Sequence, residues 1–188
     1  MSGYRLVTRQ FSPAEAAEIS GVSVTLQRDW RRRELLPPNT TGRWATFELG
    51  DIITMAVMKS FSDAGISIQK TKYLVGLALM PTYEALHRMP ALYSFDDDVD
   101  EAGRDISLWA PGFTDGPRDI GRYLVAPEDK NNNDMNVFRT ASLDRIPVLL
   151  DACGAVHCTV LDCRAMATRI AQAAKGPLFR VEMSDPSE

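Results

Sequence analysis

Apolar residues recur at helical spacing in the first 90 residues of the chain. One stripe follows the i, i+3, i+4 pattern through three turns and predicts a core-facing helix: Leu49, Ile52, Ile53, Ala56, Val57, Ser60 and Phe61. A further helix is predicted over about residues 67–80, with Leu74, Leu77 and Ala78 in the same core. Its two lysines, Lys70 and Lys72, are expected to be solvated.

Two shorter helices precede this pair. Ser12-Pro13-Ala14-Glu15 is a capping box with proline at the first helical position, so a helix begins here. Ser20-Gly21-Val22 ends that helix after about two turns, and Ser23 is a second N-cap. The second helix, residues 24 to about 34, carries Leu26 and Trp30 on one side and polar or cationic residues elsewhere.

The segment that follows predicts a two-stranded wing over residues 37–47. Leu35-Leu36-Pro37-Pro38 stops the helix, residues 39–42 are a polar turn, and residues 43–47 carry two aromatics. Two short helices, a wing and two longer helices are the layout of a winged helix-turn-helix. We therefore expect residues 23–34 to lie in a DNA major groove as a recognition helix, with the wing on the backbone.

The residue types in this segment suit DNA. Arginine pairs with guanine and glutamine with adenine in the major groove, while other cations and donors contact phosphates. The candidate base readers are Arg28, Gln27 and Arg31, and the candidate phosphate contacts are Ser23, Arg32, Arg43 and Trp44; Thr25 completes the predicted DNA-binding set. Two alternatives stay open: the run Arg31-Arg32-Arg33 is only a solvated charged face, or Trp44 folds under the wing as core.

The same residues resemble a known family. Gly21-Val22-Ser23 opens the second helix, Arg28 stands two residues before Trp30, and Leu35-Leu36-Pro37 closes the segment. This arrangement resembles the MerR family of transcription regulators, as do Phe47 four residues before Asp51-Ile52, and the turn Gly65-Ile66-Ser67. The resemblance covers about residues 11–80. It implies sequence-specific binding of double-stranded DNA for the regulation of transcription.

Some positions depart from the family pattern. Trp30 replaces a tyrosine, Asp29 replaces the first of two aromatics, and Glu34 stands where the family usually has glycine. Phosphate contacts made by tyrosine hydroxyls are therefore not carried over. The wing is offset by one residue around Gly42-Arg43-Trp44, which leaves Arg43 as the candidate equivalent of the family's wing arginine.

The resemblance also bears on the expected partners. Family members continue into a long coiled-coil helix that makes the dimer, whereas here Pro81 and Pro90 bracket only residues 82–89. An internal proline costs a helix about 3 kcal/mol, so we expect no long dimer helix and assign homodimerisation to the C-terminal half. The same absence leaves an alternative open: an excisionase-like architectural DNA-binding protein of a mobile element.

Charge and pattern both change near Pro90. Residues 1–90 hold eleven Lys or Arg against eight Asp or Glu, and residues 91–188 hold ten against seventeen. The pattern of residues 94–122 predicts a linker. A small α/β unit is predicted after it, with four elements in order: a strand at Tyr123-Leu124-Val125, a helix capped by Asp144, a strand over 156–161 and a helix capped by Asp162. The expected class is α+β: a winged helix-turn-helix domain (1–90), then an acidic α/β domain (91–188) for dimerisation, ligand binding or RNA polymerase contact.

Other chemistry finds little support. Asp96, Asp98 and Asp100 alternate as in a calcium loop, but Glu101 occupies the position that needs glycine. Cys153, Cys158 and Cys163 fall on different predicted elements, so reduced core thiols are favoured over a metal site, and no cofactor is expected.

Catalysis and membrane insertion are not indicated by the sequence. The two histidines, His87 and His157, accompany no nucleophile elbow, phosphate loop or metalloprotease pair, so we expect no enzyme. The chain contains no run of about eighteen apolar residues and no apolar leader, and a cytoplasmic protein is expected.

Overall fold

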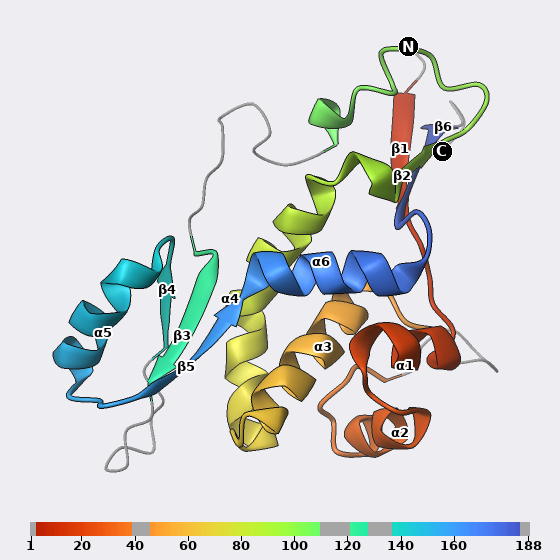
Figure 1. Ribbon diagram of the computed structural model, residues 1–188. Coiled ribbons are helices and arrows are strands. Elements are labelled where there is room, and N and C mark those ends of the chain that lie inside the picture. The colour runs from red at the N-terminus through yellow and green to blue at the C-terminus, as the bar shows by residue number, and fades with distance from the viewer. Residues whose placement is uncertain (1–2, 39–45, 110–120, 128–136, 185–188) are drawn as a thin grey trace.

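The computed structural model describes residues 3–38, 46–109, 121–127 and 137–184 (Figure 1). Within these residues, six α-helices combine with two three-stranded sheets, one ordered β1-β6-β2 and the other β4-β3-β5. The mixture of helix and sheet agrees with the predicted α+β class. None of the helices in the described part of the chain is both long and apolar enough to cross a membrane.

Helices α1 (Pro13–Ser20) and α2 (Val24–Arg32) begin where their caps predict. The Ser12 hydroxyl accepts a hydrogen bond from the Glu15 backbone N–H, and the Glu15 carboxylate accepts one from the Ser12 N–H at 2.9 Å. Gly21 ends α1 with φ 75°, a left-handed conformation that glycine adopts without a steric penalty. The Ser23 hydroxyl then accepts the Leu26 N–H and starts α2.

Helices α3 (Leu49–Asp63) and α4 (Ile68–His87) pack against each other and form the centre of the core. Ile52, Ile53 and Phe61 are buried as the apolar stripe predicts. The prediction that the fourth helix ends at residue 80 is wrong, because α4 continues through Pro81. Pro81 is itself buried, and the next residue, Thr82, donates its hydroxyl to the Ala78 carbonyl at 2.8 Å.

The first sheet joins the two ends of the chain. Strand β1 (Gly3–Thr8) pairs antiparallel with β6 (Phe179–Ser184), in a register that runs from Gly3 opposite Ser184 to Thr8 opposite Phe179. Strand β2 (Tyr93–Phe95) pairs parallel with β6 on its other side. Neither β1 nor β6 is predicted from the sequence pattern, and most of β2 lies in the predicted linker.

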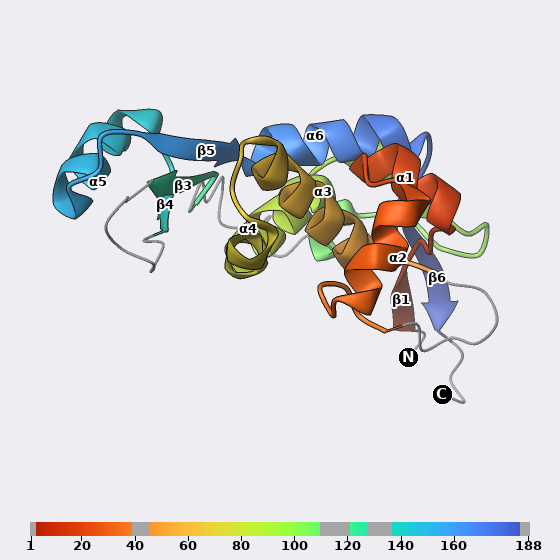
Figure 2. The ribbon, with the colours of Figure 1, turned by 90° about the horizontal axis from the view of Figure 1, so that it is seen from below.

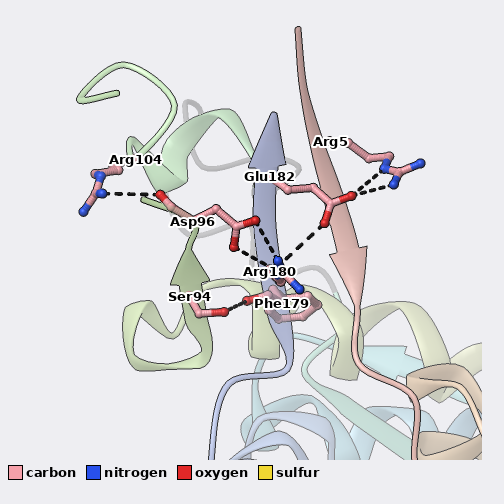
Figure 3. Close-up of polar contacts among 7 residues, drawn as sticks. All are labelled: Arg5, Ser94, Asp96, Arg104, Phe179, Arg180 and Glu182. Atoms are coloured by element: carbon pink, nitrogen blue, oxygen red, sulfur yellow. Dashed lines mark hydrogen bonds and ion pairs between the residues drawn. The ribbon is translucent and has the colours of Figure 1, made fainter. Parts of the chain in front are cut away.

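Ion pairs cross the exposed surface of this sheet (Figure 3). Arg180 donates from Nε and Nη2 to the two carboxylate oxygens of Asp96, both at 2.7 Å, and the neighbouring guanidinium lowers the pKa of Asp96. On the other side of β6, Arg5 donates to Glu182. These contacts tie β1 and the segment after β2 to the C-terminal strand.

The second sheet is antiparallel and projects from the helical body together with α5 (Ile146–Cys153), as Figures 1 and 2 show. It contains β3 (Tyr123–Pro127), β4 (Phe138–Thr140) and β5 (Cys158–Asp162). The strands predicted near residues 123 and 158 are confirmed, and α5 ends at Gly154, whose backbone is left-handed. The expected cap by Asp144 is wrong, because Asp144 lies in a 3-10 turn (Leu143–Arg145) before α5 begins.

Helix α6 (Cys163–Ala174) returns the chain from this sheet to the helical body. Asp162 caps it as predicted, accepting the N–H groups of Arg164 and Ala165. Met166 and Ile170 are buried, and the helix contacts α4, α1 and α3. Packing therefore crosses the predicted domain boundary at residue 90, since α6 and β6 complete the unit that begins with β1 and α1.

Candidate nucleic-acid interface

Helix α2, the predicted recognition helix, packs against the core through two buried side chains. Trp30 is 4% exposed and belongs to the hydrophobic core with Ile19 and Val22. Gln27 lies on the same side, three residues before Trp30, and is 2% exposed. The opposite face of α2 is exposed to solvent.

The prediction that Gln27 reads a base is wrong in this arrangement. Its side-chain amide nitrogen donates to the carbonyl of Pro13 at 3.0 Å and to the carbonyl of Val22 at 2.9 Å. Both acceptors belong to the α1–turn segment, so Gln27 joins the two helices of the motif. Its spacing from Trp30 is the signal that places it on the core side.

Three of the predicted DNA-binding residues share the exposed face of α2. Thr25, Arg28 and Arg32 are exposed, and their spacing of three and four residues sets them along one side of the helix. Within the part of the chain that the structure describes, Arg28 has no hydrogen bond or ion pair, so its guanidinium is available to a ligand. Ser23 is also exposed, at the N-terminal end of the helix, where its hydroxyl forms the cap.

Asp29 organises the arginines at the C-terminal end of α2. Its carboxylate accepts a hydrogen bond from Arg32 and forms an ion pair with Arg33 at 3.0 Å. The carboxylate stands three and four residues before these arginines, which is the spacing of helical ion pairs. Asp29 therefore offsets part of the positive charge here and fixes where the two guanidinium groups lie.

Arg31 faces the segment that returns from the predicted wing. Its guanidinium carbon lies 4.1 Å from the centroid of the Phe47 ring, and Nη2 donates to the Thr46 carbonyl at 3.4 Å. Its Nε is buried and has no hydrogen-bond partner among the described atoms. These contacts contradict the prediction that Arg31 reads bases and give it a structural role.

Part of the predicted wing is described and part is not. Phe47 forms a β-bridge with Phe11, in which each N–H donates to the other residue's carbonyl at 2.9 Å. Arg43 and Trp44, the predicted contacts at the wing tip, lie outside the described residues. The bridge anchors the C-terminal end of the wing segment beside the start of α1.

The turn after α2 contains a residue in the left-handed region. Glu34 has φ 57°, and its N–H donates to the Arg31 carbonyl at 3.0 Å. Leu35 then donates to the Trp30 carbonyl at 2.9 Å, and Leu36 is buried. The chain thus turns directly after α2. The turn is at Glu34, whose backbone conformation glycine adopts with the least strain.

Comparison with known families supports the assignment of this segment. Residues 11–75 match the model of the MerR HTH family regulatory proteins. These residues form a MerR-like helix-turn-helix domain. None of the curated proteins matches the chain.

The MerR-like domain belongs to a family of DNA-binding transcription regulators. The matched segment contains α1, α2 and α3 and ends within α4. At Glu34, where the sequence departs from the family's glycine, the backbone is left-handed. At Trp30, which replaces a tyrosine, the side chain is buried in the core and has no surface for a phosphate.

The described residues of the C-terminal half include metal-ligating and thiol side chains. Among the described residues, no group of three or more His, Cys, Asp or Glu could hold a metal ion. The cysteines are free thiols: Cys163 is buried at the start of α6, while Cys153 and Cys158 are half-buried. Burial raises the pKa of Cys163 and of Cys158, which keeps both in the less reactive thiol form.

Proposed function

We propose that this protein is a sequence-specific, double-stranded DNA-binding transcription regulator. Its α2 helix would lie in the major groove, and the segment 37–47 would contact the backbone as a wing. The observation that carries the proposal is the exposed face of α2, where Thr25, Arg28 and Arg32 project from a helix buried on its other side.

Each exposed residue has a chemical role in this proposal. Arg28 would pair with a guanine through its two-pronged guanidinium, and Thr25 would contact a neighbouring base edge. Ser23 and Arg32 would contact phosphates and set the position of the helix, as would Arg43 and Trp44 at the wing. Gln27 and Arg31 would act indirectly, by holding α1, α2 and the wing segment in their relative positions.

The acidic net charge of the chain does not oppose this proposal. The formal net charge is −4, yet the first 90 residues carry the excess of cations. A phosphate close to α2 responds mainly to charges within a Debye length of about 8–10 Å. The exposed guanidinium groups of Arg28, Arg32 and Arg33, partly offset by the Asp29 carboxylate, lie at the proposed surface.

The homodimer that the sequence assigns to the C-terminal half stays a prediction. Several apolar side chains of that half are exposed, and they are the ones such a contact would use: Leu143, Val148, Val156 and Val160. Among the described residues of 91–188, no other feature indicates a partner.

The proposal is tested by selecting bound duplexes from a random pool and mapping bound sites across the genome. Recovery of one shared motif at many promoters would support a regulator. One or two clustered sites beside a recombinase gene would support the excisionase-like alternative instead. No salt-sensitive binding to any duplex would contradict both.

Substitution of Arg43 tests the proposed role of the wing. Arg43→Ala should weaken binding to all duplexes nearly alike and lower the salt slope by about one, because one phosphate contact is lost. A change in base preference at one position would instead assign Arg43 to base readout.

A further inference from the structure

A cavity lies at the C-terminal end of α2, where this helix meets α3 and α4. Its volume is ≈ 610 Å³, within the range of about 300–1,000 Å³ that small-molecule sites occupy. The lining comes from the last turn of α2, from the turn and the two prolines that follow it, and from residues of α3 and α4. Separate segments of the MerR-like domain therefore meet around one space.

Most of the residues that line this cavity are apolar. Leu36 and Met58 belong to the buried core, and Val75 is half-buried beside them. The apolar lining consists of Leu35, Leu36, Pro37, Pro38, Met58 and Val75. Walls of this kind suit the hydrocarbon part of a ligand, because burying it there removes apolar surface from water.

The charged groups of the lining favour an anion. Arg31 and Lys72 contribute two cations from different helices, and Glu34 contributes one carboxylate, which leaves a net charge of +1. Within the part of the chain that the structure describes, Lys72 and Glu34 form no hydrogen bond or ion pair. The Lys72 ammonium is therefore available to a ligand in the cavity.

Arg31 has a donor that the fold leaves unused. Its Nε is buried and has no hydrogen-bond partner among the described atoms, and its Nη2 donates to the Thr46 carbonyl at a distance of 3.4 Å. A buried donor without an acceptor is unfavourable, and a charged acceptor is the partner that compensates it best. The planar guanidinium matches a carboxylate, which accepts two parallel hydrogen bonds.

We propose that this cavity binds a small organic carboxylate with an apolar body, and that the ligand is an effector of DNA binding. The carboxylate accepts hydrogen bonds from Arg31 and Lys72, and the apolar body packs against Leu36, Met58 and Val75. A bare anion or an uncharged apolar molecule would use only one part of this lining. The effector role, but not the site itself, rests on the proposed function.

Arg31 connects the cavity to the proposed DNA-binding surface. Its guanidinium carbon lies 4.1 Å from the centroid of the Phe47 ring, and Phe47 pairs through its backbone with Phe11. A ligand that binds Arg31 therefore acts on the residue that joins α2 to the end of the predicted wing. A ligand that binds the free and the DNA-bound protein unequally must change the affinity for DNA.

Titration of the full chain with phenylpropanoate, followed by methyl NMR of the methionines, tests the site. The Met58 resonance should shift saturably, with a Kd of about 1 mM or lower, while Met166 on α6, which lies outside the lining, should not shift. The amide of the probe lacks the charge, and acetate lacks the apolar body. Each should bind at least about tenfold more weakly.

Two substitutions locate the carboxylate. Lys72→Glu reverses one of the two cations at an exposed position and should weaken binding of the probe by at least about tenfold. Arg31→Lys keeps a cation but removes the planar guanidinium, and it should weaken binding by a similar factor, about tenfold. Thermal melting checks that both variants remain folded.

Lys70→Glu is the matched control, because Lys70 is exposed on the same helix but does not line the cavity. It should change the Kd of the probe by less than about twofold, since solvent and salt screen a charge at this distance. No saturable shift of Met58 up to about 10 mM probe would overturn the proposal. So would equal binding of the amide, or equal weakening by Lys72→Glu and Lys70→Glu.

Failure of the site and failure of the proposed function can be distinguished. At saturating probe, the Kd of the wild type for its selected duplex should change by about fivefold or more. Probe binding without binding to any duplex contradicts the proposed function alone. Duplex binding that the bound probe leaves unchanged overturns the effector role. Duplex binding without probe binding overturns the site and leaves the proposed function intact.

Discussion

Arg31 of α2 lies over the ring of Phe47, with 4.1 Å between the guanidinium carbon and the ring centroid. Phe47 in turn pairs through its backbone with Phe11, immediately before the cap of α1. One cation thus joins α2, the end of the wing segment and the start of the helix-turn-helix. This relationship gives the first residue of the arginine run a structural role.

Replacing Arg31 should therefore reduce stability. Arg31→Ala removes the contact with the Phe47 ring and the hydrogen bond to Thr46, and the free energy of unfolding should fall by about 1–2 kcal/mol. Chemical denaturation measures the loss. Arg33→Ala is the control, because Arg33 is exposed and pairs only with Asp29 among described residues; its effect should stay within about 0.5 kcal/mol. An altered base preference in Arg31→Ala would show that Arg31 reads DNA after all.

Gln27 gives a second prediction about support of the helix. Gln27→Ala removes the donor of two hydrogen bonds, to the carbonyls of Pro13 and Val22, which should cost about 1–3 kcal/mol of unfolding free energy. Base preference should be unchanged once the protein is folded. A matched substitution on the exposed face, Thr25→Ala, should have the opposite profile, with little effect on stability and a measurable effect on duplex preference.

Glu34 offers a stabilising substitution. Its left-handed backbone costs a non-glycine residue about 1 kcal/mol, whereas glycine adopts this conformation freely. Glu34→Gly should therefore raise the melting temperature. The entropy that glycine adds to the unfolded chain reduces this gain in stability. Glu34→Ala is the control and should not stabilise. A lower melting temperature for the glycine variant would mean that the Glu34 side chain stabilises the fold.

His87 predicts how stability depends on pH. Its Nδ1 lies 2.7 Å from the Tyr93 hydroxyl, its ring stacks on Phe179, and burial lowers the pKa of His87 to about 4. An exposed histidine titrates near 6.5, so between these values the unfolded chain binds a proton that the folded chain does not. The free energy of unfolding should fall as the pH drops through this window, by about 1.4 kcal/mol per pH unit.

Comparing variants across that pH range isolates the contribution of His87. His87→Asn should be less stable at pH 7 but should lose less stability than the wild type between pH 6.5 and about 4. Equal slopes for the two proteins would contradict the burial-driven shift.

The first four helices could be predicted because their signals are local. The capping box at Ser12, the left-handed Gly21 and the apolar stripe of α3 each lie within a few residues of the element that they define. The helix through Pro81 could not be predicted in the same way. The local rule ends a helix there, whereas packing of α4 against α3 and α6 keeps it intact.

The sheet that joins the chain ends was missed for a related reason. Strands β1 and β6 pair across more than 170 residues, and neither carries a turn signal that names its partner. Likewise, glutamine is a residue type expected at the surface. Gln27 is buried instead, because its side-chain amide donates to the Pro13 carbonyl of α1. Local sequence is enough to predict the helix-turn-helix. The structure is needed to show which of its polar residues are buried supports and which are exposed.

The most direct test of the account is the binding of Arg28→Ala to the selected duplex and to its single base-pair variants, measured by fluorescence anisotropy at fixed salt. Arg28→Ala should lose about 1–3 kcal/mol of binding free energy on the selected duplex and show a relaxed preference at one base pair, with wild-type stability. Wild-type affinity together with an unchanged preference at every position would contradict the placement of α2 in the major groove.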